Sequence, residues 1–173
     1  MFKGFLIELI KKFAVRHGEF TLASGRVSPY YINLKDAYTR PEVMREIILA
    51  MKEAVQGFSV DRVAGMELGA VPLAVALSME LGIPFVIIRK EKKDHGAGQR
   101  IEGEIGEGDF VLIVEDVATT GASIASAAEV IREAGGRCSK AIAVVDRLEG
   151  ARENLEKINI ELSSLLTIKD LGL

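Results

Sequence analysis

The chain has 173 residues, of which 49% are hydrophobic and 27% charged, and its formal net charge is −3 at neutral pH. This profile is typical of one globular domain with a sizeable core, and the slightly negative charge gives no reason to expect nucleic acid or a membrane as a partner. The single cysteine, Cys138, excludes an internal disulfide and a cysteine-rich zinc site.

The first residues predict an amphipathic helix. Apolar side chains recur there at helical spacing, namely Phe2, Phe5, Leu6, Leu9, Ile10 and Phe13. The same segment carries lysines and lacks a small-residue cleavage site, so we do not expect a signal peptide. No run reaches the roughly 18 apolar residues that span a bilayer. We therefore expect a cytoplasmic protein.

The next segment lacks helical periodicity. Residues 21–35, TLASGRVSPYYINLK, contain Gly and Pro breakers followed by a short apolar run. This pattern is typical of a hairpin or of irregular strands. Thr39 and Glu42 then form a capping-box pattern, which predicts the start of a helix with its apolar face at Met44, Ile47, Ile48 and Met51.

From residue 60 onward, strands alternate with helices. Apolar runs predict strands at 60–66, 84–89, 110–116, 140–146 and 160–168, with helices over 71–81 and 124–131, the second ended by Gly135 and Gly136. Strands that are apolar throughout indicate a parallel sheet covered on both faces. We predict an α/β fold with a doubly wound, mostly parallel sheet. It forms a single domain over residues 1–173, with a small N-terminal extension at about 1–38 to which the C-terminus can contribute.

Four strand ends in this scheme carry polar or glycine-rich chemistry. They are residues 65–69 (GMELG), the segment from Arg89, the segment from Glu115-Asp116, and Asp146-Arg147. Ligands of open α/β sheets bind outside the carboxyl ends of the strands. We therefore expect all four segments to lie on one rim of the sheet.

Residues 110–121, FVLIVEDVATTG, are the most informative part of the chain. An apolar run ends in the acidic pair Glu115-Asp116, and a Thr/Gly/Ser loop then leads into a helix. Two carboxylates are costly inside a buried strand, so we expect them where the strand emerges into a crevice. The loop offers backbone N–H groups and hydroxyls to an anion at a helix N-terminus. The combination suggests a ribose-phosphate site, although carboxylates here could also simply cap the helix.

Residues 89–100, RKEKKDHGAGQR, form a basic segment. Five basic and two acidic residues give it a formal charge of +3 within a chain of −3. Glycines at 96 and 98 favour a loop that can close over a polyphosphate, exclude water and neutralise a departing pyrophosphate. The alternative is a solvated charged loop.

The strand, the acidic pair and the TTG loop together resemble the PRPP-binding signature of the type I phosphoribosyltransferases, where PRPP is 5-phosphoribosyl 1-pyrophosphate. The resemblance implies that Glu115 and Asp116 hold the ribose hydroxyls, directly or through Mg²⁺. Mg²⁺ is the implied cofactor, carried by PRPP near this pair and not held by a complete protein site. The remaining PRPP contacts implied here, including those of the 5′-phosphate, are Val117, Ala118, Thr119, Thr120, Gly121, Ala122 and Ser123.

The basic segment narrows the resemblance to the orotate phosphoribosyltransferases through its RKExKDHG pattern. The matching residues that bind the pyrophosphate of PRPP are Arg89, Lys90, Lys93 and His95. In that family part of this loop serves the neighbouring subunit's site, which implies a homodimer. The implied catalytic residues are Lys93 and His95, which stabilise or protonate the leaving pyrophosphate, and Asp116.

The remaining motifs of the same family concern the base and the leaving pyrophosphate. TLASGRVSPYY resembles its hood, which lies over the pyrimidine ring and from which Tyr30 or Tyr31 contacts orotate. GMELGAVP, residues 65–72, matches its pyrophosphate loop. Arg147 is the implied orotate-recognition residue, with help from Thr119, because a planar forked donor suits a carboxylate edge.

The implied reaction transfers the 5-phosphoribosyl group of PRPP to N1 of orotate, giving orotidine 5′-monophosphate and pyrophosphate in de novo pyrimidine biosynthesis. The chain departs from many bacterial members at Ala23 and Gly69, where they carry lysine. Three alternatives stay open: a purine phosphoribosyltransferase, which would lack the hood and RKExKDHG; a PRPP-sensing regulator, which normally adds a DNA-binding domain; and a receiver-type phosphate-binding domain. His17 matches no catalytic position in the family.

Overall fold

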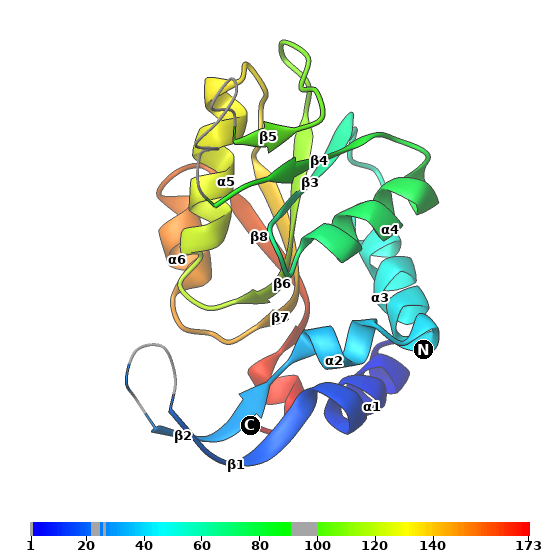
Figure 1. Cartoon of the computed structure of the whole chain (residues 1–173), viewed down its shortest axis with the longest axis vertical. Helices are drawn as coiled ribbons and strands as arrows, with labels where there is room; N and C mark the ends of the chain where they lie inside the picture. Colours follow the sequence, from blue (N-terminus) through cyan, green and yellow to red (C-terminus); the bar gives the residue numbers. More distant parts are fainter. Residues whose placement is uncertain (1, 22–24, 26, 91–99) are drawn as a thin grey trace.

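The computed structural model describes residues 2–21, 25, 27–90 and 100–173. At its centre is a six-stranded sheet in the order β5-β4-β3-β6-β7-β8 (Figure 1). Only the edge strand β5 runs antiparallel to its neighbour, so the prediction of a mostly parallel sheet is confirmed. The strands are β3 (Arg62–Met66), β4 (Phe85–Ile88), β5 (Ile101–Glu102), β6 (Val111–Ala118), β7 (Lys140–Asp146) and β8 (Glu161–Thr167).

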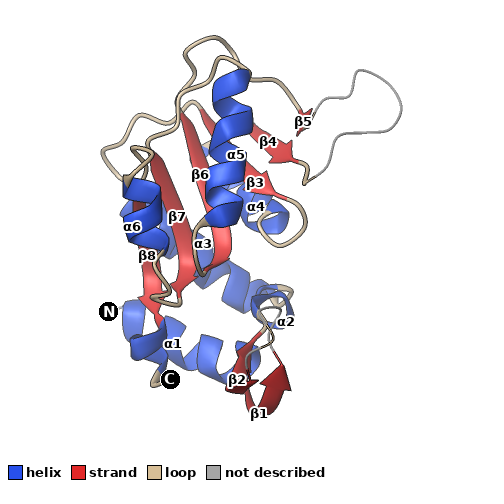
Figure 2. Ribbon diagram, turned by 90° about the vertical axis from the view of Figure 1, so that its left-hand side faces the viewer, coloured by secondary structure: helices blue, strands red, loops and turns tan. Residues whose placement is uncertain are grey.

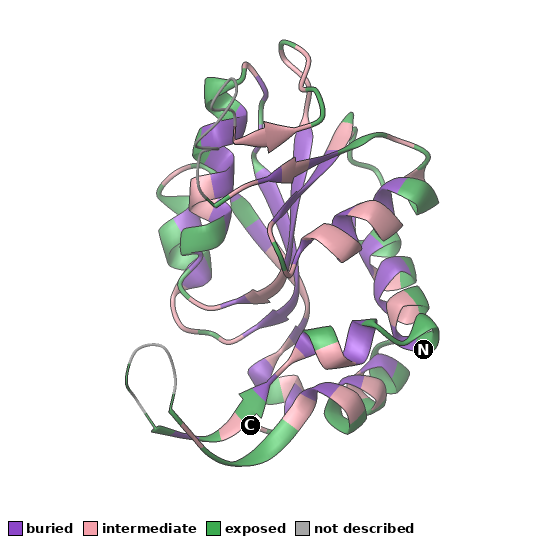
Figure 3. Ribbon diagram, viewed as in Figure 1, coloured by how far each residue is buried: buried purple, intermediate pink, exposed green. Residues whose placement is uncertain are grey.

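Helices cover both faces of this sheet (Figure 2). One face carries α3 (Pro41–Ala54) and α4 (Val71–Leu81), and the other carries α5 (Ala122–Glu133) and α6 (Ala151–Glu156). Successive side chains of a strand point to opposite faces. Leu112 and Val114 of β6 accordingly pack with α3 and α4, whereas Ile113 packs with α5. Two buried faces explain why the central strands are apolar throughout (Figure 3).

The N-terminal extension lies at the carboxyl end of the strands (Figure 1). It consists of α1 (Phe2–Ala14), the antiparallel pair β1 (Val15–Thr21) and β2 (Val27–Ile32), and the short helix α2 (Leu34–Tyr38). The C-terminal turn η1 (Ile168–Leu171) packs against α1, with Lys3 Nζ 3.0 Å from Asp170 Oδ1. Leu6 and Ile10 of α1 belong to the same buried cluster as Leu112 and Val114 of β6, so the extension and the sheet share a core.

Two details of the sequence prediction were wrong. The capping box does not form, because α3 begins at Pro41 after Arg40, and no side chain caps it. The fixed φ of proline suits the first helical position, while the Thr39 hydroxyl donates instead to the Asp36 carbonyl, 3.4 Å away. On α1, Phe5 was expected on the apolar face but is exposed.

Candidate active site

The carboxyl ends of β3, β4, β6 and β7 lie side by side, because these four strands are parallel neighbours. Hydrogen bonds join the loops that follow them. The Lys90 N–H donates to Glu67 Oε1 (2.8 Å), and the Arg147 N–H donates to the Ala118 carbonyl (2.9 Å). The prediction of a single rim is therefore confirmed.

The loop between β6 and α5 forms a small hollow of about 40 Å³, lined by Glu115 and residues 117–124. Gly121 has a φ of +83°, and a Cβ there would lie 3.0 Å from Leu155 Cγ, so both backbone and packing favour glycine. No side chain caps α5, and its first turn contains no acidic residue. Its N-terminal N–H groups and the positive end of its dipole therefore face the hollow, an arrangement that suits a phosphate.

The acidic pair lies inside β6, which continues to Ala118, two residues beyond the predicted end of the strand at 116. Glu115 is buried, and its Oε1 accepts a hydrogen bond from the Asp116 N–H (3.0 Å). The Asp116 side chain is 15% exposed and accepts from the Val117 N–H (2.8 Å). Burial, reinforced by the neighbouring Asp116, raises the pKa of Glu115 to about 8. At neutral pH Glu115 is therefore largely protonated, and Asp116 carries the negative charge.

This raised pKa predicts a pH-dependent stability. The pKa of Glu115 is about 8 in the folded protein against an ordinary value of 4.5, so its contribution is fully present below pH 4.5 and is lost as the pH rises toward 8. We expect the free energy of unfolding of the wild-type protein to fall by about 4 kcal/mol between pH 5 and pH 8.5, and Glu115→Gln to remove this fall. Urea denaturation of both proteins at several pH values measures it.

The control for this experiment is Glu80→Gln, which changes a surface carboxylate paired with Lys52. A hydrogen bond from Arg62 lowers the pKa of Asp109, and one from the Thr167 backbone lowers the pKa of Asp170. These two carboxyl groups therefore change the free energy of unfolding only in more acidic solution. Parallel pH profiles for the wild-type protein and Glu115→Gln would contradict the assignment.

The pyrophosphate-loop segment closes on the acidic pair from the β3 side. The Tyr38 hydroxyl of α2 donates to the Gly69 carbonyl (2.9 Å), and burial, together with the charges of Asp116 and Glu115, raises the pKa of Tyr38 to about 12. A Cβ on Gly69 would overlap Asp116 Oδ2. Glycine at position 69 thus has a physical reason in this chain, because the carboxylate of Asp116 occupies the space of a side chain.

The structure brings Arg147 and Tyr30 together at the end of β7. The Arg147 guanidinium carbon lies 5.7 Å from the centre of the Tyr30 ring, and Nε lies 3.0 Å from Glu149 Oε1. Tyr31 points the other way; it is 42% exposed, and its ring centre lies 5.7 Å from that of Phe20. Of the two tyrosines predicted to contact the base, only Tyr30 lies with Arg147.

The turn that carries Arg147 is held by a buried carboxylate that the sequence analysis did not single out for this role. Asp146 accepts hydrogen bonds from the Leu148 N–H and from Arg152 Nε, both at 2.8 Å. Arg152 also donates to Ser164 Oγ on β8 (2.9 Å). Asp146 therefore positions Arg147. The only sign of this role in the sequence is that Asp146 stands next to Arg147 at the end of a strand.

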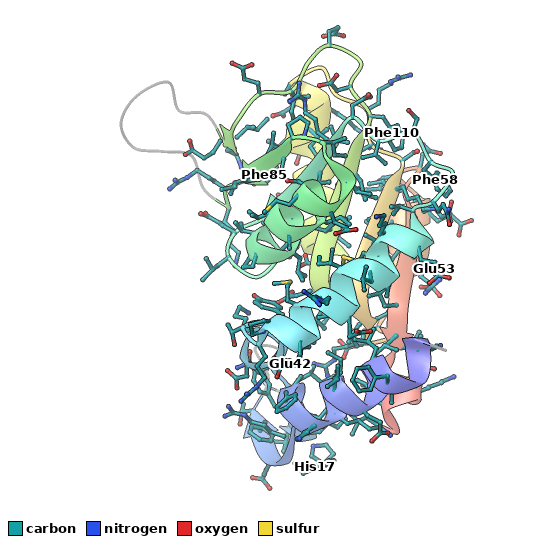
Figure 4. All side chains as sticks on the ribbon, turned by 90° about the vertical axis from the view of Figure 1, so that its right-hand side faces the viewer. His17, Glu42, Glu53, Phe58, Phe85 and Phe110 are labelled. Carbon is teal, nitrogen blue, oxygen red and sulfur yellow. The ribbon has the colours of Figure 1, made fainter. Side chains whose placement is uncertain are left out.

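The described part of the basic segment consists of its two ends. The Arg100 Nε donates to the Arg89 carbonyl (3.1 Å), and Arg89 itself is paired with Glu102 at 3.4 Å. Lys90 is exposed beside them. Lys93 and His95, and likewise Ala23 of the hood motif, lie outside the described residues. His17 is exposed at the outer edge of β1 (Figure 4), in keeping with its lack of a catalytic match.

The donor set of the rim fits Mg²⁺ arriving with a substrate. No group of three or more His, Cys, Asp or Glu side chains that could hold a metal occurs in the described ranges. Glu115 and Asp116 nevertheless supply hard oxygen ligands beside the phosphate hollow. Mg²⁺ commonly uses one or two carboxylates together with substrate phosphates. None of the helices in the described ranges is both long and apolar enough to cross a membrane.

The fold and the phosphate loop define a phosphoribosyltransferase, and residues 35–164 match the family model of the phosphoribosyl transferase domain. The orotate phosphoribosyltransferase of Methanocaldococcus jannaschii is 50% identical over 170 residues, which cover 98% of this chain and 96% of that protein. Hence the chain belongs to the orotate phosphoribosyltransferase family.

Solved structures agree with this membership. The crystal structure of orotate phosphoribosyltransferase from Mycobacterium tuberculosis has a TM-score of 0.90 and 36% identity, with 100% of both chains covered. A second structure of that enzyme, in complex with PRPP, has a TM-score of 0.85 and 33% identity over 100% of both chains. The prediction of a type I phosphoribosyltransferase fold is therefore confirmed.

Proposed function

We propose that this protein transfers the 5-phosphoribosyl group of PRPP to N1 of orotate, giving orotidine 5′-monophosphate and pyrophosphate for pyrimidine biosynthesis. The observation that carries the proposal is the pair formed by Arg147 and Tyr30, 5.7 Å apart, directly beside the acidic strand β6. An aromatic face and a planar forked donor suit a flat ring bearing a carboxylate. Family membership and the PRPP complex of the M. tuberculosis relative support the same assignment.

The acidic pair suits the ribose of PRPP through its two different protonation states. Neutral Glu115 can donate one hydrogen bond, whereas ionised Asp116 can only accept, so together they match hydroxyl groups that both donate and accept. The N-terminus of α5 and the Thr119–Ser123 loop bind the 5′-phosphate at the other end of the sugar. PRPP is thereby held at two points, which fixes the direction in which C1′ faces the base.

Catalysis in this arrangement needs no covalent nucleophile. Orotate is anionic, and the transition state has the character of a ribosyl oxocarbenium ion, so the protein must hold base and sugar in line and stabilise the departing pyrophosphate. Asp116, the ionised member of the pair, would hold Mg²⁺, which supplies charge neutralisation to PRPP when bound. Arg89, Lys90, Lys93 and His95 of the basic segment supply the remaining positive charge toward the pyrophosphate.

A substrate panel tests the reaction. Protein, Mg²⁺ and PRPP are incubated separately with orotate, uracil, hypoxanthine or xanthine, and pyrophosphate release is measured. Release with orotate alone is the expected result. Release with a purine alone would replace the proposal by a purine phosphoribosyltransferase, and PRPP binding without release from any base would favour a regulator.

We further propose a homodimer formed through α4. This helix is apolar nearly all round, which is typical of a helix that is buried on every side. In the single chain, however, Leu68 just before it is 71% exposed and Met79 is 78% exposed, with the half-buried Pro72 and Val75 between them on the same face. An apolar stripe of this length indicates a contact with another chain, and a second copy is the occupant that the family resemblance implies.

The basic segment starts at the edge of this α4 face. The Lys90 N–H is bonded to Glu67, the residue before the exposed Leu68. A segment that starts beside the proposed contact between subunits starts close to the neighbouring subunit. This placement supports the proposal that Lys93 and His95 act in the partner's site.

Sharing of the loop predicts complementation between inactive variants. Lys93→Ala and Arg147→Ala damage different halves of such a composite site, so a mixed dimer has one intact site. We expect an equal mixture, after subunit exchange, to regain about a quarter of the wild-type activity. The steady-state rate of pyrophosphate release measures it.

The control places Met79→Lys in both chains, which should prevent the mixed dimer and abolish the recovery. A mixture no more active than the mean of its two parents, with subunit exchange shown by light scattering and mass spectrometry, would mean that each loop serves its own subunit.

A further inference from the structure

The short helix α2 connects the extension to the rim. Its Leu34 and Ala37 are buried in the same cluster as Val114 of β6, and its Tyr38 hydroxyl is bonded to the Gly69 carbonyl at 2.9 Å. Figure 1 shows α2 beside the carboxyl ends of the central strands. The side chains of α2 that face the rim are therefore held in fixed positions next to the acidic pair.

Lys35 is the charged residue of α2 that faces this pair. Its Nζ lies 3.5 Å from Asp116 Oδ2, and the positive charge of Lys35 also lowers the pKa of Glu115 against the effect of burial. The Lys35 side chain remains 51% exposed, whereas Asp116 is 15% exposed. The ammonium group thus lies at the solvent-exposed edge of the site, where it contacts Asp116 and is accessible to a second anion.

Two arginines of the described rim are paired with different carboxylates. Arg89 lies 3.4 Å from Glu102, and Arg147 lies 3.0 Å from Glu149. Lys35 instead pairs with a residue to which the proposed function assigns the sugar of PRPP. The ion pair therefore lies where the negative charges of PRPP arrive.

The pyrophosphate-loop segment cannot itself place a cation at this point. A Cβ on Gly69 would overlap Asp116 Oδ2, so any longer side chain would have to displace the carboxylate. The Gly69 carbonyl is occupied by Tyr38. The positive charge between Asp116 and the loop comes from α2.

We propose that Lys35 is a further PRPP-binding residue of this chain. In the free protein its ammonium neutralises Asp116, and in the complex it contacts the pyrophosphate side of PRPP, which ties α2 to the occupied site. The inference rests on the proposed function in so far as PRPP is taken as the ligand.

The test measures PRPP binding directly, by isothermal titration calorimetry with PRPP and Mg²⁺ in the absence of base. We expect Lys35→Ala to bind PRPP about tenfold more weakly, since one phosphate-directed cation is lost. Lys35→Arg, which keeps the charge, should stay within about threefold of the wild type. In the kinetic assay Lys35→Ala should raise KM for PRPP by about the same factor and leave KM for orotate within about twofold.

Lys52→Ala is the matched control, because Lys52 also forms an exposed ion pair, 2.6 Å from Glu80, far from the rim. Its PRPP affinity should equal that of the wild type. Unchanged PRPP affinity in Lys35→Ala would overturn the inference, as would an equal loss in Lys35→Arg and Lys35→Ala, or a loss that equally affects KM for orotate.

These outcomes are separable from a failure of the proposed function. If the wild-type protein binds PRPP but releases no pyrophosphate with orotate, the reaction assignment is wrong, while a weaker PRPP affinity of Lys35→Ala still supports the role of Lys35. If the wild-type protein turns over orotate and Lys35→Ala binds PRPP normally, only the inference about Lys35 falls.

Discussion

Asp116→Asn is expected to lower kcat/KM for PRPP by about 10³-fold, because the substitution keeps the shape of the side chain and removes the negative charge of the acidic pair. Glu115 is largely protonated, so under the proposed function Asp116 is the group that would accept hydrogen bonds from the ribose and face Mg²⁺. The same variant should be more stable than the wild type without substrate, since the charge of Asp116 helps to raise the pKa of the buried Glu115. Steady-state kinetics and urea denaturation at pH 8 measure the two effects.

Opposite signs of these two effects separate a lost function from a lost fold. Asp61→Asn is the matched control, because Asp61 accepts a hydrogen bond from the Phe110 N–H at the amino end of the same strand (2.8 Å). That variant should lose some stability and keep its kcat/KM. An Asp116→Asn enzyme within tenfold of the wild type would contradict the assigned role.

The large elements could be predicted from the sequence because their periodicity is long enough to be distinctive. The helix predicted over 71–81 and the strand predicted over 140–146 coincide with α4 and β7. Short elements could not be predicted, since the two residues of β5 and the five of α2 are too few for a pattern to repeat. Because α2 was not predicted, two residues that reach the site from it, Lys35 and Tyr38, were not identified as site residues.

The parts of the site that lie on strand ends could also be predicted, because parallel strands bring their carboxyl ends together whatever their side chains are. Orientation within the hairpin could not. Adjacent tyrosines point to opposite faces, and strand alternation alone does not say which of them meets Arg147. The pKa of Glu115 could not be predicted either, since it depends on the burial of Glu115 within β6, which continues to Ala118.

Arg147→Ala is expected to lower kcat/KM for orotate by about 10³-fold while changing the affinity for PRPP by less than about threefold. The guanidinium is nearly buried beside Tyr30, and its removal would leave the carboxylate edge of the base without a forked donor. Arg147→Lys keeps the charge but not the fork, so it should recover little of the loss. Kinetics with each substrate varied, together with calorimetric PRPP binding, measure both quantities.

Arg137→Ala is the control, because Arg137 donates to the Gly108 carbonyl at the opposite end of the sheet (2.8 Å) and should leave both substrates unaffected. A parallel loss of PRPP affinity in Arg147→Ala would mean that this arginine supports the β6 loop, to which its backbone is bonded through Ala118, and does not choose the base. Loss of orotate use with PRPP binding intact would instead separate the two tasks between neighbouring strands. In that case β6 and its loop bind the ribosyl donor, and the end of β7, together with Tyr30, selects the acceptor.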